Sequence, residues 1–196
     1  MKTLNPTGLC ALLLQLVLVH SAAASDNWRY PEALGEFRLV TRAVYPEPSL
    51  GVVGRYSGAA AQRQLLDIFT YPVPGAWRAL DAERVLRAHF EQLLEEIVDM
   101  GRESGGRVIT VLERGSTTLS DGETARWARL SDQRGAQVFD GVLVLTVRDA
   151  HFVKLRASQR GPLATDEVIG LLQTWLEDQQ TRSTADTPRP VASPAP

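Results

Sequence analysis

The sequence is poor in cysteine. Cys10 is the only cysteine among 196 residues, and it lies inside an apolar N-terminal run. A chain that loses this run has no thiol, which excludes disulfide bonds, thiol catalysis and cysteine-ligated metal sites. A secreted eukaryotic domain of this size usually contains disulfides. We therefore expect a bacterial protein whose fold depends on its hydrophobic core alone.

Lysine and histidine are also scarce, and the net charge is small. Beyond residue 24, Lys154 is the one lysine, and the remaining positive charge comes from arginine. The formal net charge of −2 offers no general attraction to nucleic acid, whose binding proteins are usually basic. His89 and His151 are the histidines of this part, and neither belongs to a metal-binding pattern such as HExxH. We expect no nucleic-acid partner, no cofactor and no metal site.

The N-terminus has the layout of a secretory signal peptide. A positive start is followed by an apolar run over residues 9–19, and then by small residues in which Ala22 and Ala24 fit a signal-peptidase site. The run is too short to span a bilayer, which takes about 20 residues. We predict that residues 1–24 are a signal peptide cleaved near Ala24. The mature chain is then periplasmic or secreted and has no membrane span.

The rest of the chain is predicted to form one domain with two flanking segments. Residues 25–35 are interpreted as an irregular lead-in and residues 36–180 as a single α+β domain. Residues 181–196 contain four prolines and almost no large apolar side chain, which predicts a disordered tail.

The strongest helical pattern spans residues 81–101. Asp81 is predicted to cap the first turn, and Gly101 is predicted to end the helix. Apolar residues recur at three- and four-residue spacing, so they share one face. The predicted buried face consists of Val85, Leu86, Phe90, Leu93, Leu94, Ile97 and Val98. A helix with one apolar face needs a sheet or another helix to cover it.

Alternating and β-branched segments predict strands on both sides of this helix. The expected strands are residues 37–45, 50–56, 64–71, 107–114, 123–130, 136–147 and 151–158. Residues 115–122 are expected to be a polar loop and residues 132–135 a hairpin turn. A second helix is predicted from Thr165 or Asp166 to about Gln180, with Val168, Ile169, Leu172, Trp175 and Leu176 on its buried face.

The resulting order is βββ-α-ββββ-α. Strands joined by short turns pair in antiparallel fashion, so we predict an α+β fold with an antiparallel sheet of about six or seven strands covered by two helices. This order resembles that of the small sandwich domains grouped with the oxygen-evolving-complex protein PsbP and with Mog1. The resemblance concerns topology, and no residue motif carries a function across it.

Three functions remain open on the sequence. The first is an exported periplasmic accessory or binding domain without evident catalytic residues, with an envelope protein or a small ligand as its partner. The second is a carrier of a small apolar ligand, in a cavity between the long helix and the sheet lined by Phe90, Leu94, Trp127 and Phe139. The third is a hydrolase or isomerase that uses His151, oriented by Asp149 two residues before it.

The arginines suggest one more binding surface. Arg38 and Arg42 are expected on one face of the first strand, and Arg126, Arg148 and Arg156 belong to later strands. If one face of the sheet is open, these side chains predict a cationic patch for an acidic partner. The alternative is an ordinary charged outer face, in which acidic residues lie between the arginines.

Overall fold

The computed structural model describes residues 28–185, so the expected signal peptide and residues 186–196 of the expected tail lie outside the described residues. The strands are β1 (Ala33–Leu34), β2 (Phe37–Val44), β3 (Val52–Ser57), β4 (Leu65–Pro72), β5 (Arg107–Thr118), β6 (Thr124–Arg134), β7 (Gln137–Arg148) and β8 (His151–Arg160). The α-helices are α1 (Ala82–Glu103) and α2 (Thr165–Ala185), and the short 3-10 turns are η1 (Pro48–Leu50), η2 (Ala60–Gln62) and η3 (Gly75–Trp77).

The strands form one antiparallel sheet in the order β1-β2-β3-β4-β8-β7-β6-β5. The α+β fold with two helices is confirmed, but the sheet has eight strands, not six or seven. The additional strand is β1, which lies in the segment expected to be irregular. It has two residues, too few to leave an alternating pattern in the sequence.

The sheet consists of two antiparallel halves that meet at β4 and β8. Strands β1 to β4 follow one another in space as in sequence, and so do β5 to β8. The chain leaves interior strand β4, passes through α1 and enters the sheet again at the far edge, in β5. The pairing of β4 with β8 therefore brings Leu65–Pro72 beside His151–Arg160.

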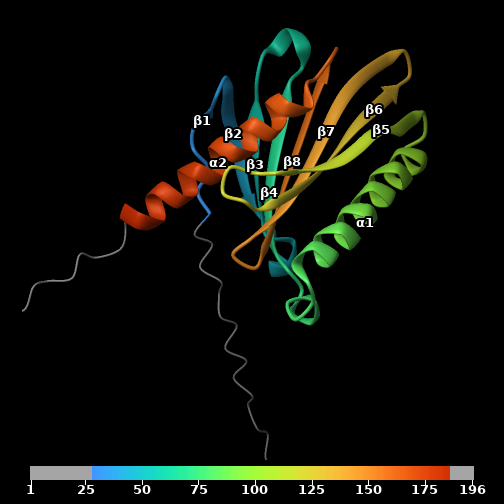
Figure 1. Cartoon of the computed structure of the whole chain (residues 1–196). Helices are drawn as coiled ribbons and strands as arrows, with labels where there is room; N and C mark the ends of the chain where they lie inside the picture. Colours follow the sequence, from blue (N-terminus) through green and yellow to red (C-terminus); the bar gives the residue numbers. More distant parts are fainter. Residues whose placement is uncertain (1–27, 186–196) are drawn as a thin grey trace, which may run out of the picture.

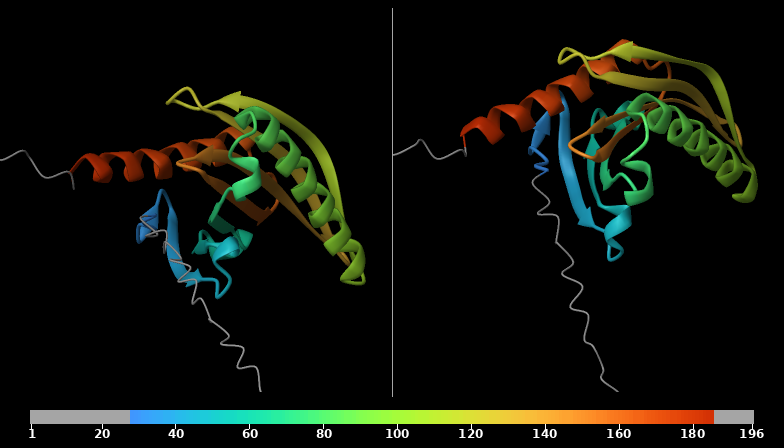
Figure 2. Two further views of the ribbon diagram at one scale, coloured as in Figure 1. Left: turned by 90° about the horizontal axis from the view of Figure 1, so that it is seen from below. Right: turned by 60° about the horizontal axis from the view of Figure 1, so that its bottom comes forward.

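The two helices cover opposite faces of the sheet (Figure 1). Alternate side chains of one strand enter different cores, as period-2 geometry requires. On β7, Val142 and Val144 join the cluster under α2, whereas Leu143 and Leu145 join the cluster under α1. The β5–β7 part of the sheet curves past α1, and the C-terminal end of α2 projects beyond the strands (Figure 2).

Helix α1 begins as its sequence predicts and ends later. Asp81 Oδ1 accepts a hydrogen bond of 2.8 Å from the backbone N–H of Arg84, which confirms the cap. The predicted buried face is confirmed except for Val98, which is half-buried. The prediction that Gly101 ends the helix is wrong. A Cβ at this buried glycine would lie 3.0 Å from Ile109 Cγ1, so Gly101 allows α1 to pack closely on β5.

Other predicted boundaries differ by more than the usual uncertainty of a helix or strand end. The predicted loop 115–122 is in its first half a continuation of β5, and the predicted turn 132–135 is mostly the end of β6. Turn-forming residues are common in both segments, but cross-strand pairing extends through them. The buried face predicted for α2 is confirmed, while the helix continues to Ala185, into the expected tail. No helix within residues 28–185 is long and apolar enough to cross a membrane.

Candidate ligand pocket

A pocket of about 670 Å³ lies beside α1, on the face of the sheet that this helix covers. Strands β4 and β8 form its floor, α1 forms one wall, and residues around η1 and η3 form the rest of its rim. We call it the Lys154 pocket. Its main side chains are Phe69, Tyr71, Trp77, His89, Phe152 and Lys154.

Cross-strand pairing explains the floor. Phe69 stands directly opposite Lys154, and Tyr71 stands opposite Phe152. Residues two apart on a strand share a face, so these four side chains are neighbours on one face of the sheet. Lys154 Nζ lies 4.1 Å from the centroid of the Phe69 ring and 5.6 Å from that of Tyr71. These distances are those of cation–π contacts, which favour the charged ammonium.

Helix α1 and the η3 turn complete the aromatic lining of the pocket with His89 and Trp77. The Tyr71 hydroxyl and His89 Nε2 share a hydrogen bond of 2.8 Å. The His89 ring centroid lies 4.2 Å from that of Phe152 and 5.9 Å from that of Trp77. Burial lowers the pKa of His89 and raises the pKa of the Tyr71 hydroxyl, so both side chains are neutral at pH 7.

Lys154 is held in this ring-lined site without a carboxylate partner. Among residues 28–185 its ammonium forms neither a hydrogen bond nor an ion pair. Burial and, to a smaller extent, the nearby Arg156 lower the Lys154 pKa to about 8, although Glu96 and Asp67 act in the opposite direction. The ammonium form still predominates at pH 7. A partly buried cation without a carboxylate at ion-pair distance is the kind of group that an anionic ligand stabilises.

The residues predicted to line a helix–sheet cavity do not converge. Phe90 and Leu94 are 1% and 4% exposed and pack in the filled core between α1 and the sheet. Trp127 packs against the core on the opposite face, under α2. Phe139 is buried, and the Arg134 guanidinium lies 4.9 Å from its ring centroid. None of the four lines the Lys154 pocket.

The predicted catalytic pair is joined through the backbone. His151 Nδ1 lies 2.7 Å from the carbonyl oxygen of Asp149, within hydrogen-bond distance, and the Asp149 carboxylate takes no part in this contact. Asp149 and Ala150 have φ values of 49° and 58° and form the tight turn between β7 and β8. The Trp28 ring packs edge-on against the His151 imidazole, with the two ring centroids 5.9 Å apart. This arrangement fixes the orientation of the ring.

The predicted arginine surface is divided between the two faces of the sheet. A β-bulge between Leu39 and Thr41 shifts the register of β2, so Arg38 pairs with Ser57 and Arg42 with Gly54. The expectation that Arg38 and Arg42 share a face is therefore wrong, because an extra residue reverses the alternation. The later arginines are also separated by their partners: Arg126 lies 3.8 Å from Glu83, and Arg148 pairs with Asp121.

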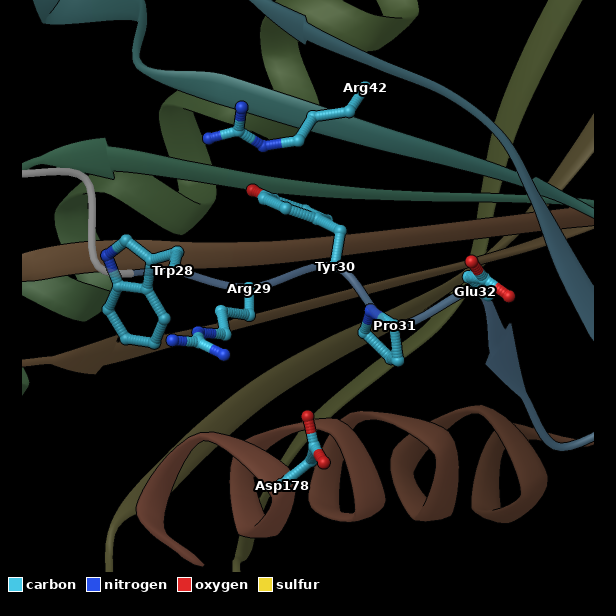
Figure 3. Close-up of a pocket in the computed structure, with 7 residues that line it drawn as sticks. All are labelled: Trp28, Arg29, Tyr30, Pro31, Glu32, Arg42 and Asp178. Carbon is cyan, nitrogen blue, oxygen red and sulfur yellow. The ribbon is translucent and has the colours of Figure 1, made fainter. Parts of the chain in front are cut away.

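A second pocket, of about 540 Å³, lies on the α2 side around residues 28–32 (Figure 3). Figure 3 shows Tyr30 between Arg42 on β2 and Asp178 on α2. The Tyr30 hydroxyl lies 2.9 Å from Thr70 Oγ1, and the Arg42 guanidinium lies 5.7 Å from the Tyr30 ring centroid. A Cβ at Gly54 would lie 2.1 Å from Tyr30 Cδ1. This segment is thus packed onto the sheet by its own side chains.

Sequence reasoning missed most of the Lys154 pocket. Its α1 wall consists of His89, Gln92, Leu93 and Glu96. Of these, His89 and Leu93 each lie one residue before a predicted candidate, Phe90 or Leu94. Trp77 lies in η3, between the predicted strand 64–71 and the predicted helix 81–101, where no helix or strand was predicted. One signal was available: Lys154 is the one lysine beyond residue 24, in an otherwise alternating strand.

Comparisons with known proteins give similarity at low identity. No family model and no curated protein matches the chain. Among solved structures, cyanobacterial PsbP (CyanoP) from Synechocystis sp. PCC 6803 matches with a TM-score of 0.47 and 14% identity over 79% of this chain and 86% of that chain. The Saccharomyces cerevisiae Ran-binding protein Mog1p matches with a TM-score of 0.39 and 12% identity over 75% and 84% of the two chains.

A Pseudomonas aeruginosa protein of unknown function, described as a putative regulator, also matches. Its TM-score is 0.36 and its identity 11%, over 75% of this chain and 88% of that chain. Both groups that share the predicted order of elements are therefore among the matches. No function is transferred to this chain from proteins at this level of similarity.

Proposed function

We propose that this chain is an exported accessory or binding domain of the bacterial envelope that binds a small ligand in the Lys154 pocket. The observation that carries the proposal is the contrast between this pocket and the remainder of the α1 interface. Phe90, Leu94 and their neighbours fill that interface. At its border, aromatic rings and one ammonium instead face a recess large enough for a small molecule.

The chemistry of the pocket supports binding more than catalysis. The Tyr71 hydroxyl and the His89 imidazole are hydrogen-bonded to each other and are both neutral at pH 7. A ring-lined recess with few polar groups is typical of a site that recognises an apolar body and orients it. Within residues 28–185, no cluster of three or more histidine and acidic side chains is arranged to hold a metal ion.

Export is supported by the sequence. The apolar run and the alanines before Ser25 have the order of a cleavable signal peptide, and the chain beyond residue 24 has no cysteine to require a disulfide. Mass spectrometry of the protein recovered from the periplasm of an expressing cell should give an N-terminus at or near Ser25. Recovery of the intact Met1 form from the cytoplasm would refute this part of the proposal.

Ligand binding can be followed at a single residue. The chain has four tryptophans, and of these Trp77 lines the Lys154 pocket, whereas Trp127 and Trp175 belong to the α2 side. We expect small aromatic fragments, screened at millimolar concentration as neutral, anionic and cationic sets, to shift the Trp77 indole signal in ¹⁵N NMR spectra. The signals of Trp127 and Trp175 should stay in place.

A matched pair of variants tests where the fragments bind. Gln92 is an exposed residue of α1 that lines the pocket, and Glu95 is exposed on the same helix outside it. Gln92→Phe should obstruct the recess and abolish the Trp77 shift, and Glu95→Phe should not. If no fragment of any charge moves the Trp77 signal of the folded protein, the proposed function is wrong.

A further inference from the structure

The side chains that line the Lys154 pocket carry an excess of positive charge. Lys154 and Arg78 are cations, Glu96 is the one carboxylate of the lining, and two positive charges against one negative leave one positive charge. The whole chain, in contrast, has a formal net charge of −2. The net charge of the pocket lining is therefore opposite in sign to that of the whole chain.

Two of these three charged side chains already form hydrogen bonds within the protein. Arg78 is exposed, and its Nε donates to the carbonyl oxygen of Val73 at 3.2 Å. Glu96 Oε1 accepts a hydrogen bond of 2.8 Å from Gln92. Lys154 is different, because its contacts are with the faces of Phe69 and Tyr71. Its ammonium keeps its donors for a group that enters the pocket.

The next cation along β8 strengthens the local field. Arg156 lies two residues beyond Lys154 and so projects from the same face of the sheet. Its cross-strand partner is Asp67, but Asp67 binds Arg55 through two hydrogen bonds of 2.7 and 3.0 Å. Within residues 28–185, Arg156 forms no ion pair at contact distance. Its charge thus adds to that of Lys154.

We propose that the ligand of this pocket is a small organic monoanion, with an aromatic or short acyl body and a carboxylate that pairs with the Lys154 ammonium. The inference rests on the proposed function, since it names the ligand class for the same site. The rings of Phe69, Tyr71, Trp77 and Phe152 take up the apolar body. The carboxylate supplies an ion-pair partner for Lys154, which has none at contact distance among residues 28–185, in a partly buried site where a charge-assisted hydrogen bond is strong.

Three probes of nearly equal shape distinguish the effect of ligand charge on affinity from the effect of ligand shape. They are 2-naphthoate, its neutral amide 2-naphthamide, and the cationic 2-naphthylmethylamine. Titration followed at the Trp77 indole signal should give binding about tenfold or more tighter for the naphthoate than for the amide, because the acceptor that meets the ammonium then carries a full negative charge. The cationic probe should bind most weakly.

Substitution of Lys154 tests the assignment to this residue. Lys154→Met keeps an unbranched apolar stem and removes the terminal ammonium with its charge, so the preference for naphthoate over naphthamide should disappear while the amide still binds. The matched control is Arg78→Met, which removes the exposed cation of the rim and should retain most of the preference. Equal loss in both variants would overturn the assignment to Lys154.

The pH dependence provides a second readout. Because the Lys154 pKa is about 8, naphthoate binding should weaken as the pH rises from 7 to 9.5, whereas naphthamide binding should not. The groups that face Lys154 do not produce the same dependence. His89 has a lowered pKa and Tyr71 has a raised one, so neither side chain changes its charge between pH 7 and 9.5.

The outcomes distinguish this inference from the proposed function. If naphthamide shifts Trp77 with the same affinity as naphthoate, the pocket binds ligands but does not select anions, and the inference is wrong. Preference for the cationic probe has the same meaning. If none of the three probes, and no member of the wider fragment set, moves the Trp77 signal, the proposed function fails as well.

Discussion

At the scale of single residues, Asp132 shows what local composition does not reveal. Its side chain is 6% exposed and accepts hydrogen bonds from Arg107 and Arg134, with the closest contacts at 2.7 Å. The segment Asp132–Gly135 has the composition of a turn and was predicted to be one. The partner Arg107 lies on β5, 25 residues earlier, and such cross-strand pairing leaves no signal in neighbouring residues.

The ion cluster of Asp132, Arg107 and Arg134 makes the stability of the fold depend on pH in the acid range. Burial acts to raise the pKa of the Asp132 carboxyl, but the hydrogen bonds and charges of Arg107 and Arg134 outweigh it and hold the pKa at about 2. The folded pKa lies below the value of about 3.9 for an unfolded aspartate. The cluster therefore contributes its full stability above about pH 4, and this contribution is lost as the pH falls toward 2.

We expect Asp132→Asn to lower the free energy of unfolding by about 2–3 kcal/mol at pH 7, because it leaves two arginines without their carboxylate. The difference from wild type should shrink between pH 4 and pH 2, where the wild-type carboxyl becomes protonated. Urea unfolding at pH 7, 4 and 2.5 measures both effects. Asp99→Asn is the control: its ion pair with Arg102 is exposed, so the cost should be at most about 0.5 kcal/mol. A pH-independent cost of Asp132→Asn would contradict this account.

At the scale of elements, α1 is the part that the sequence predicts best. Its apolar spacing and its Asp81 cap are local features, and both are confirmed. The end of α1, in contrast, is not determined by its local sequence. Gly101 lies against Ile109 of β5, and the helix ends before the C-cap residue Ser104, whose backbone N–H donates to the Met100 carbonyl. The Lys154 pocket likewise lies at the border of the apolar face, where His89 and Leu93 meet β4 and β8, one strand from each half of the sheet.

The buried face of α1 gives a second stability prediction. Phe90→Ala and Leu94→Ala each remove a side chain from the filled core, and we expect each to lower the free energy of unfolding by roughly 2–5 kcal/mol. The control is Glu95→Ala on the exposed side of the same helix, with an expected cost of about 0.5 kcal/mol or less. Urea denaturation of the three variants decides the matter. Near-neutral effects of both core substitutions would mean that this interface is not filled.

At the scale of the whole molecule, the element types were predictable and their arrangement was not. Periodicity distinguishes helix from strand, and the short turns predict antiparallel neighbours. The pairing of β4 with β8 joins segments that lie on either side of α1 and three further strands, and no pattern within either segment encodes it. The floor of the Lys154 pocket depends on that pairing, because Phe69 and Lys154 become neighbours only across it.

The same pairing has a consequence for unfolding. The two cores lie on opposite faces, but they share β4, β6, β7 and β8, whose alternate side chains enter each core. Loss of either core therefore exposes strands that the other core needs. We expect the chain to unfold in a single transition, although its sheet is built from two halves and covered by two separate helices.

Fluorotryptophan incorporation tests this at defined positions. Trp77 reports on the α1 side, and Trp127 and Trp175 report on the α2 side. In a urea titration followed by ¹⁹F NMR, the native signals of all three should disappear with the same midpoint. In Phe90→Ala, which weakens the α1 core directly, the midpoints of Trp127 and Trp175 should fall as far as that of Trp77, because the two faces share their strands. Earlier loss of the Trp175 signal alone would show that α2 separates from the sheet before the sheet unfolds, and the single-transition account would be wrong.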